Sequence, residues 1–358
     1  MTVDPREEAV RRAYEAARFD ERTPDERGFA ETFEKEIKPK LIAGVGFNRS
    51  VKEARLRRRK IAFALAVSYV VVSLFVLAIL DLPDSGVGLQ LFLFGSFFVG
   101  SALWNYAFMK RAGEEDPNNA AVIDAVLARF GCRMGSGFAK YVALPFAAPI
   151  TPSYSDFSFV NEHLTGTFDE RIPFVALRLT MKAKSGKSKI TTFKGWYLNI
   201  ELPFSFSGTT IIHERLSVYH RIPGGRNLGV VSLESLEYEK RFTVKSSNQT
   251  EARVILTPDV MHHLALEADR FASEGKGWNP SGNLMLGFSE NRAHIWMPSR
   301  ETALSVWNPL DPTAMIEGLH GAFEELAEMR AFLRDIDVIA ESEGFRALAA
   351  KNGRSEAS

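Results

Sequence analysis

The sequence predicts an α+β protein in two parts: a two-helix transmembrane hairpin, and a cytoplasmic domain with a largely antiparallel sheet and flanking helices. Two observations support this fold class. First, two uncharged apolar runs follow each other closely, at residues 61–80 and 87–108. Second, segments of alternating polarity are grouped between residues 140 and 300, and a long helical pattern follows them. Strands that are grouped apart from helices are typical of an α+β domain.

Residues 1–55 are predicted to form a cytoplasmic helical segment. Thr23 has the side chain of a helix N-cap, and Pro24 follows it at the first helical position. An apolar side chain then recurs every four residues, at Phe29, Phe33, Ile37 and Leu41. Pro39 lies within this stripe, and proline is expected to kink or end a helix.

The run at residues 61–80 contains no charge and has side-chain polar atoms only on Ser68, Tyr69 and Ser73. A bilayer core requires about 20 apolar residues in a helix. The second run, at 87–108, is less apolar because it contains Gln90 and Asn105. A pair of buried core helices is the alternative, but such helices rarely remain uncharged for this length. We therefore expect a transmembrane hairpin over residues 56–111.

The flanking charges predict the orientation of this hairpin. Asp81 and Asp84 lie in the connecting turn, which contains no basic residue, whereas basic residues precede the first run and follow the second. Positive charge is retained in the cytoplasm, so both termini of this multi-pass membrane protein are expected there. The cluster before the first run would also contact anionic lipid, although setting the topology is its simpler role. This cluster comprises Arg57, Arg58, Arg59 and Lys60.

Residues 112–340 are predicted to form the α+β domain, and residues 341–358 a disordered tail. Thr257-Pro258 and Asp311-Pro312 are helix starts, and Glu290-Asn291 is a hairpin turn. The expected helices cover residues 118–130 and 257–273 and a long segment from 311, and the expected strands cover 173–184, 189–204, 209–219, 238–246, 251–257 and the hairpin at 282–298.

Composition excludes some classes of function and leaves others open. The chain has 358 residues, with 44 Lys+Arg and 44 Asp+Glu, which argues against a nucleic-acid-binding protein. Its single cysteine, Cys132, allows no intramolecular disulfide and suits a reducing compartment. Neither a catalytic motif nor a metal or cofactor motif is present. His262 and His263, for example, are adjacent and would point to different faces of a helix.

Two groups of residues are candidate interaction sites. Glu251 and Arg253 are two apart on a predicted strand and would share one face, where they form a cross-strand ion pair or contact a partner. Phe193, Gly195 and Trp196 form the other group, and their aromatic rings suit either a recognition surface or the core.

Four lysines flank a predicted turn at Ser185-Gly186, namely Lys182, Lys184, Lys187 and Lys189. Solvation of a hairpin end accounts for them. The alternative is contact with the anionic inner leaflet of the membrane, because basic residues near such a surface are attracted to it.

Three stretches resemble a known family: "FEKEIKPKL" at 33–41, "TTFKGWYLNIELPF" at 191–204 and "FTVKSSNQTEARVILTPDVMHHL" at 242–264. Together they resemble the uncharacterised bacterial membrane protein family called domain of unknown function 3137. The resemblance covers residues 29–335. It implies a membrane location and a shared fold, and it implies no activity.

These observations favour a membrane-anchored interaction or scaffold domain that assembles with itself or with other membrane proteins. A membrane-tethered hydrolase, whose Asp, Glu and His residues are brought together only by the fold, is an alternative. A small oligomeric channel is another, because Ser96 and Gly100 have the spacing of a helix-packing motif.

Overall fold

The structure is a computed structural model. It describes residues 4–79, 95–96, 98–103, 117–135, 140–152, 154–168, 172–202, 204–214, 228–273, 284–298 and 310–341. The chain forms two compact units. Unit 1 consists of residues 1–123 and 307–318, and unit 2 consists of residues 124–306 and 319–358.

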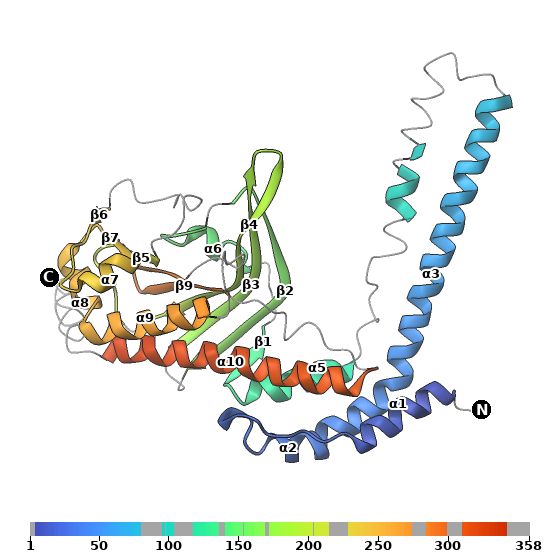
Figure 1. Ribbon diagram of the computed structural model, residues 1–358, viewed down its shortest axis with the longest axis horizontal. Helices are drawn as coiled ribbons and strands as arrows, with labels where there is room; N and C mark the ends of the chain where they lie inside the picture. The colour runs from blue at the N-terminus through green and yellow to red at the C-terminus, as the bar shows by residue number, and fades with distance from the viewer. Residues whose placement is uncertain are drawn as a thin grey trace. The chain divides into compact units, whose positions relative to one another are not determined.

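Unit 1 is built from helices (Figure 1). Asp4 caps the first of them, since its side chain accepts a hydrogen bond from the N–H of Arg6 at 2.8 Å. The predicted start at Thr23-Pro24 is confirmed as a short 3-10 turn in which Thr23 and Glu26 form a capping box. The elements are α1 (Pro5–Ala16), η1 (Pro24–Glu26), α2 (Phe29–Thr32), a π-helical turn η2 (Phe33–Ile37) and α3 (Lys38–Ile79).

The predicted apolar stripe is confirmed, because Phe29, Phe33, Ile37 and Leu41 are all buried. Pro39 does not end the helix, however, and α3 continues to Ile79. The irregularity lies in η2, where the N–H of Lys38 donates to the carbonyl of Phe33, five residues back. The π turn shifts the hydrogen-bond ladder directly before the residue that has no N–H to donate.

The predicted transmembrane hairpin at residues 56–111 is not supported. Within the residues that the structure describes, no helix has both the length and the apolarity required to cross a membrane. Helix α3 includes residues 61–79 of the first apolar run. The second run, at 87–108, lies outside the described residues except for 95–96 and 98–103, and the tail at 342–358 also lies outside them.

Unit 2 contains a nine-stranded sheet with the strand order β1-β2-β3-β4-β9-β8-β5-β7-β6. Every pair in it is antiparallel, so the prediction of an α+β fold with a large antiparallel sheet is confirmed. The strands are β1 (Cys132–Met134), β2 (Asp156–Phe168), β3 (Ile172–Ser185), β4 (Ser188–Glu201), β5 (Thr210–Glu214), β6 (Gly229–Val230), β7 (Phe242–Ser246), β8 (Met285–Ser289) and β9 (Arg292–Pro298).

The remaining helices flank these strands in the sequence. Helices α5 and α10 each have residues in both units. The others belong to unit 2 and include α9, whose start at Thr257-Pro258 is as predicted. Their bounds are α5 (Pro117–Ala128), α6 (Leu144–Ala147), α7 (Leu236–Arg241), α8 (Gln249–Ile255), α9 (Pro258–Ser273) and α10 (Pro312–Glu341).

Two strand predictions need correction. The strand predicted at 238–246 begins only at Phe242, because residues 236–241 form helix α7, and the strand predicted at 251–257 is wrong. Residues 251–255 belong to helix α8, not to a strand. The side chain of Asn248 accepts a hydrogen bond from the N–H of Glu251 at 3.2 Å, which caps the helix. This local cap and the packing of Ile255 in the core outweigh the strand preference of the β-branched residues that follow Arg253.

Different segments cover the two faces of the sheet in unit 2. Neighbouring residues on a strand point to opposite faces, as Trp196 and Tyr197 do on β4. The indole of Trp196 donates to Glu325 of α10 at 2.9 Å, so this face of the sheet packs against α10. The hydroxyl of Tyr197 donates to the carbonyl of Leu144 in α6 at 3.0 Å. Apolar residues from both sequence halves of the sheet, including Leu177 and Trp296, complete the core on the α6 side.

Candidate functional site

The four predicted lysines lie at the tip of the β3–β4 hairpin and all are exposed. The two strands turn at Ser185–Ser188, where Gly186 has φ 60°, as the sequence predicted. Lys184 lies opposite Lys189 in the ladder, so at this point two like charges face each other across the strands. Like charges opposite each other destabilise a strand pair, so this arrangement does not serve the fold.

One carboxylate lies beside these lysines. Asp156 begins β2, and its side chain pairs with the ammonium of Lys189 at 2.8 Å. The hydrogen bond from Lys189 lowers the pKa of Asp156 below its ordinary value. Both side chains are at least half exposed, so the pair contributes little to stability.

Three aromatic rings gather beside the same hairpin end. Phe146 lies 4.8 Å from Phe157 and 5.3 Å from Tyr154, measured between ring centroids. Phe146 packs on the core, but 43% of Tyr154 and 44% of Phe157 remain exposed. The register of β2 fixes their position, because Asp156 lies opposite Lys182.

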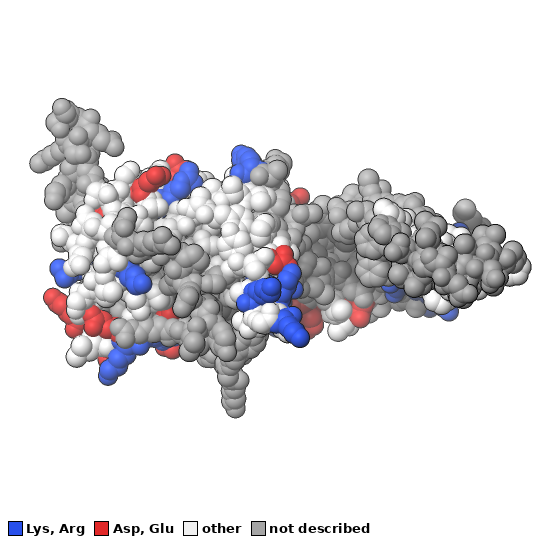
Figure 2. Space-filling view, turned by 90° about the horizontal axis from the view of Figure 1, so that it is seen from above, with Lys and Arg blue, Asp and Glu red and all other residues white. Residues whose placement is uncertain are grey.

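We call this surface the lysine–aromatic tip. It consists of Lys182, Lys184, Lys187, Lys189, Phe146, Tyr154 and Phe157. On the face seen in Figure 2, the basic and acidic side chains occur in small separate groups among larger areas of other residues. The tip thus joins a local basic group to exposed apolar rings.

The basic cluster before the first apolar run lies on α3. Arg57, Arg59 and Lys60 are exposed, whereas Arg58 is buried, with 7% of its surface accessible. Large apolar side chains follow the cluster along the same helix and are also exposed, namely Ile61, Phe63, Leu65, Val67, Val70, Val71, Val72 and Phe75.

Glu251 and Arg253 do not form the pair that the sequence predicted. Because they lie two apart on a helix, their side chains point in different directions. Glu251 is buried and accepts hydrogen bonds from the N–H groups of Ser207 and Gly208, each at 2.8 Å. Arg253 is exposed and donates to the carbonyl of Ser232 at 3.4 Å. Glu251 therefore fixes the loop before β5.

Phe193, Gly195 and Trp196 lie in β4, and the side chains of Phe193 and Trp196 are fully buried. The ring of Phe193 packs edge-on against Trp296, with centroids 5.2 Å apart. These two aromatic side chains consequently have no surface to offer a partner, and they belong to the core.

Sequence reasoning missed a buried ion pair on the same hairpin. Both carboxylate oxygens of Glu325 lie 3.1 Å from Nη1 of Arg178, and Nε1 of Trp196 donates to the same carboxylate. Arg178 is 2% exposed and stacks over the Trp196 ring at 5.3 Å. Trp196 lies opposite Arg178 in the ladder, which brings the two together. The pair joins the sheet to α10.

A second buried polar group lies on the α6 side of the sheet. The hydroxyl of Tyr197 lies 2.7 Å from Nδ1 of His294, and Arg292 donates to the amide oxygen of Asn199 at 2.6 Å. The Tyr197 hydroxyl uses its proton to donate to the carbonyl of Leu144. It therefore accepts a hydrogen bond from His294, whose Nδ1 carries a proton. Burial lowers the pKa of His294 to about 4 and raises that of Tyr197. The imidazole is thus neutral near pH 7 and serves as a structural hydrogen-bonding group.

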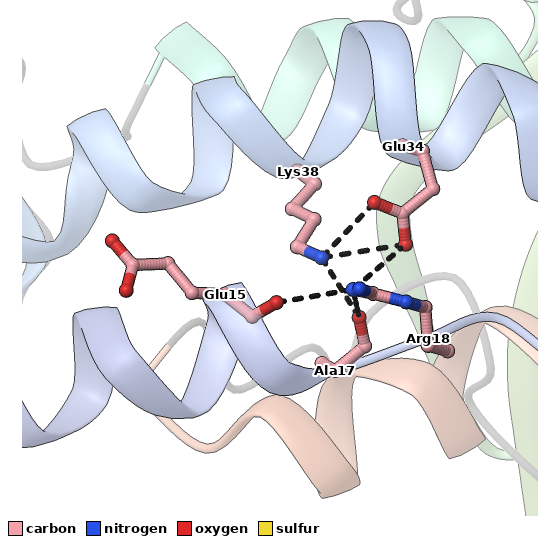
Figure 3. A network of polar contacts seen from close by, with 5 residues as sticks. All are labelled: Glu15, Ala17, Arg18, Glu34 and Lys38. Carbon is pink, nitrogen blue, oxygen red and sulfur yellow. Dashed lines mark hydrogen bonds and ion pairs between the residues drawn. The ribbon is translucent and has the colours of Figure 1, made fainter.

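Unit 1 contains a polar network at the end of α1 (Figure 3). The ammonium of Lys38 is 2.9 Å from the carbonyl oxygen of Ala17 and 3.0 Å from Glu34. Arg18 donates to the carbonyl oxygens of Glu15 and Ala17, each at 3.0 Å. Cations that satisfy the last carbonyls of a helix stabilise its C-terminus, so this network is a cap for α1.

The alternative of a hydrolase, whose Asp, Glu and His residues are brought together by the fold, would be favoured by a deep pocket that holds several carboxylates or histidines. A cavity of about 450 Å³ lies in unit 1, and its lining includes one carboxylate, Glu317, and no histidine. Glu317 is already held by the Arg22 guanidinium at 2.7 Å. Across the described residues, no three His, Cys, Asp or Glu side chains are grouped closely enough to hold a metal ion.

Comparison with known proteins supports the family resemblance. The model of a family described as "Protein of unknown function (DUF3137)" matches residues 191–338, and this confirms the predicted resemblance over that range. No curated protein matches the chain. A solved structure, the crystal structure of the mycobacterial trehalose monomycolate transport factor A, TtfA, is similar at 10% identity over 56% of this chain and 97% of that chain. Its TM-score is 0.26, which is too low to support a conclusion about fold or function.

Proposed function

We propose that the protein is a membrane-anchored interaction or scaffold module. In this proposal, residues 61–80 and 87–108 insert into a bacterial inner membrane, and the antiparallel sheet domain lies on the cytoplasmic side. The single observation that carries it is the exposed apolar surface of α3 directly after a basic cluster. Phe63 and Phe75 are 72% and 66% exposed, and the uncharged run continues to Leu80, beyond the described residues.

An exposed apolar surface of this extent is expected to be buried against lipid or another protein. Burial of apolar surface is worth about 25 cal/mol per Å², so eight large side chains left in water would be strongly unfavourable. Contiguous exposed apolar patches mark membrane or protein contact sites. Lipid fits best because Arg57, Arg59 and Lys60 are exposed at one end of the patch, where headgroups would lie.

The sheet domain itself favours binding over catalysis. Two of its buried polar side chains have structural partners, since Arg178 pairs with Glu325 and His294 lies beside the hydroxyl of Tyr197. Its charged surface groups are exposed. The partners that we propose are the lipid bilayer and either further copies of this chain or other membrane proteins, which would associate through the apolar helices.

Membrane flotation of the full-length chain tests the anchor. We expect the chain to float with vesicles of neutral lipid and to resist extraction by alkali and by salt. In the variant Val67→Asp/Val71→Asp, each carboxylate would cost about 2.5–3.5 kcal/mol at the membrane centre, so extraction should become easy. The matched control Ala54→Asp/Leu56→Asp places the same charges at exposed positions before the run and should leave flotation unchanged. A wild-type chain that remains unbound would contradict the proposal.

Reporter fusions test the orientation. Fusions after Asp84 and after Ser358 should report opposite sides of the membrane, because basic residues flank the two runs and none lies between them. Equal signals at both fusions would exclude the hairpin.

A further inference from the structure

We infer that the lysine–aromatic tip is a second membrane contact, which binds the headgroups of anionic phospholipids and places two aromatic rings at headgroup depth. This inference rests on the proposed membrane anchor, which holds the sheet domain near a bilayer. It adds a site and a ligand class to that proposal, since the tip would distinguish anionic from neutral lipid.

Charge supports the ligand class. Four exposed lysines face one carboxylate, that of Asp156, which leaves an excess of three positive charges within the tip. Lys184 and Lys189 lie opposite each other, an arrangement that repels in the free protein and that a layer of anionic headgroups would relieve. A lysine near such a layer strengthens binding about fivefold.

The aromatic rings support a membrane surface as the source of those anions. Amphipathic rings are enriched at the level of lipid headgroups. Tyr154 and Phe157 are each more than two-fifths exposed, and their centroids lie 6.0 Å apart, so they offer a continuous apolar edge. The N–H of Ser155 donates to the carbonyl of Lys182 at 2.7 Å, which attaches this edge directly to the lysine-bearing strand.

The tip is already ordered for such a contact. Ladder hydrogen bonds continue from Lys182 to the turn, and Phe146 holds both exposed rings against the core. Binding would therefore order little additional backbone, and only the flexible lysine side chains would lose freedom. A nucleic acid or an acidic peptide would also attract lysines, but the formal charge of the chain is zero, which disfavours a nucleic-acid partner.

A fluorophore at the tip of the full-length chain tests the inference. Ser188 is exposed, so Ser188→Cys accepts an environment-sensitive dye. Burial raises the pKa of Cys132 to about 12, which keeps the native thiol unreactive, and a parallel chain with Cys132→Ala verifies this. The labelled chain is reconstituted in vesicles of phosphatidylcholine, with or without phosphatidylglycerol, that carry a lipid-linked quencher.

We expect the dye to move into an apolar environment and to be quenched only when phosphatidylglycerol is present. About 0.5 M salt should reverse the signal, because it screens exposed charges. Changing the four lysines to Gln should shift the equilibrium between bound and free tip at least tenfold towards the free state. Tyr154→Ser/Phe157→Ser should weaken quenching while leaving the salt dependence intact. The melting temperature of each variant shows whether it remains folded.

A charge-matched control uses four exposed basic residues away from the tip: Arg129→Gln, Arg133→Gln, Lys240→Gln and Arg253→Gln. This variant should behave like the wild type. Quenching that ignores lipid charge, or that survives the four lysine changes, would overturn the inference, as would a signal produced by DNA or an acidic peptide but not by lipid. Flotation with pure phosphatidylcholine reports the anchor separately, so failure of the anchor and failure of the tip are distinguishable.

Discussion

The middle and the tip of the β3–β4 hairpin both carry basic residues, but these residues have different surroundings. Near the middle of β3, Arg178 is buried and paired with Glu325, and it contributes to the attachment of α10. Four residues further along the same strand, Lys182 is exposed at the tip. A basic residue on this hairpin is therefore structural where other elements bury it, and it remains accessible at the tip, where the lysines are exposed. Burial, rather than residue type, separates the two roles.

The largest effect is expected from breaking the buried pair. Arg178→Ala should lower the free energy of unfolding by about 3–5 kcal/mol, because it removes the buried guanidinium that contacts both oxygens of the Glu325 carboxylate. Lys182→Ala on the same strand should cost less than about 0.5 kcal/mol. Urea unfolding followed by tryptophan fluorescence measures both, since Trp196 and Trp296 are buried in unit 2.

Replacing both members of the buried pair tests whether Arg178 and Glu325 act as a unit. Arg178→Met/Glu325→Met removes both charges, so it should be less destabilising than Arg178→Ala. If the double variant were as unstable as the two single changes added together, the pair would not act as a unit.

The next effect concerns pH. The pKa of His294 is about 4 in the folded protein, below the ordinary 6.5, so the unfolded state binds the proton more readily. The contribution of neutral His294 to the free energy of unfolding is thus fully present above pH 6.5. It is lost as the pH falls towards 4, by up to about 3 kcal/mol. His294→Asn should flatten the profile of unfolding free energy over this range. His262→Asn changes an exposed imidazole and should not.

A smaller effect separates Glu251 from Arg253. Glu251→Ala should destabilise unit 2 by about 1–3 kcal/mol, because the N–H groups of Ser207 and Gly208 lose their charged acceptor. Arg253→Ala removes an exposed side chain and should stay within about 0.5 kcal/mol. If the two variants lost the same amount of melting temperature, the result would support the predicted pairing of Glu251 with Arg253.

Local pattern was sufficient to predict much of the sheet. Val175, Leu177, Leu179 and Met181 recur at every second position, and the turn at Ser185-Gly186 follows them, so β3, β4 and the lysines at their tip could be placed. The hairpin at Glu290-Asn291 was predicted in the same way, and Glu290 has φ 51°. Period-two alternation and turn residues are short-range signals.

The features of the fold and the site that the sequence did not predict depend on contacts between distant segments. Strand β2 was missed because its polar residues obscure the alternation, which a register shift between Phe159 and His163 also interrupts. The role of Arg178 could not be predicted, since its partner Glu325 lies 147 positions away in the sequence. Tyr154 and Phe157 are visible in the sequence as aromatic residues, but only the pairing of β2 with β3 places them beside the lysines.

The difference between the tip and the middle of the hairpin can be measured most directly by hydrogen exchange in the full-length chain, reconstituted in neutral and then in anionic lipid. If the tip binds anionic headgroups while the middle of the hairpin only supports the fold, anionic lipid should slow amide exchange at residues 182–189 and leave residues 174–179 and 195–200 unchanged. Exchange that is the same in both lipids at the tip, or that changes equally along the whole hairpin, would contradict this account.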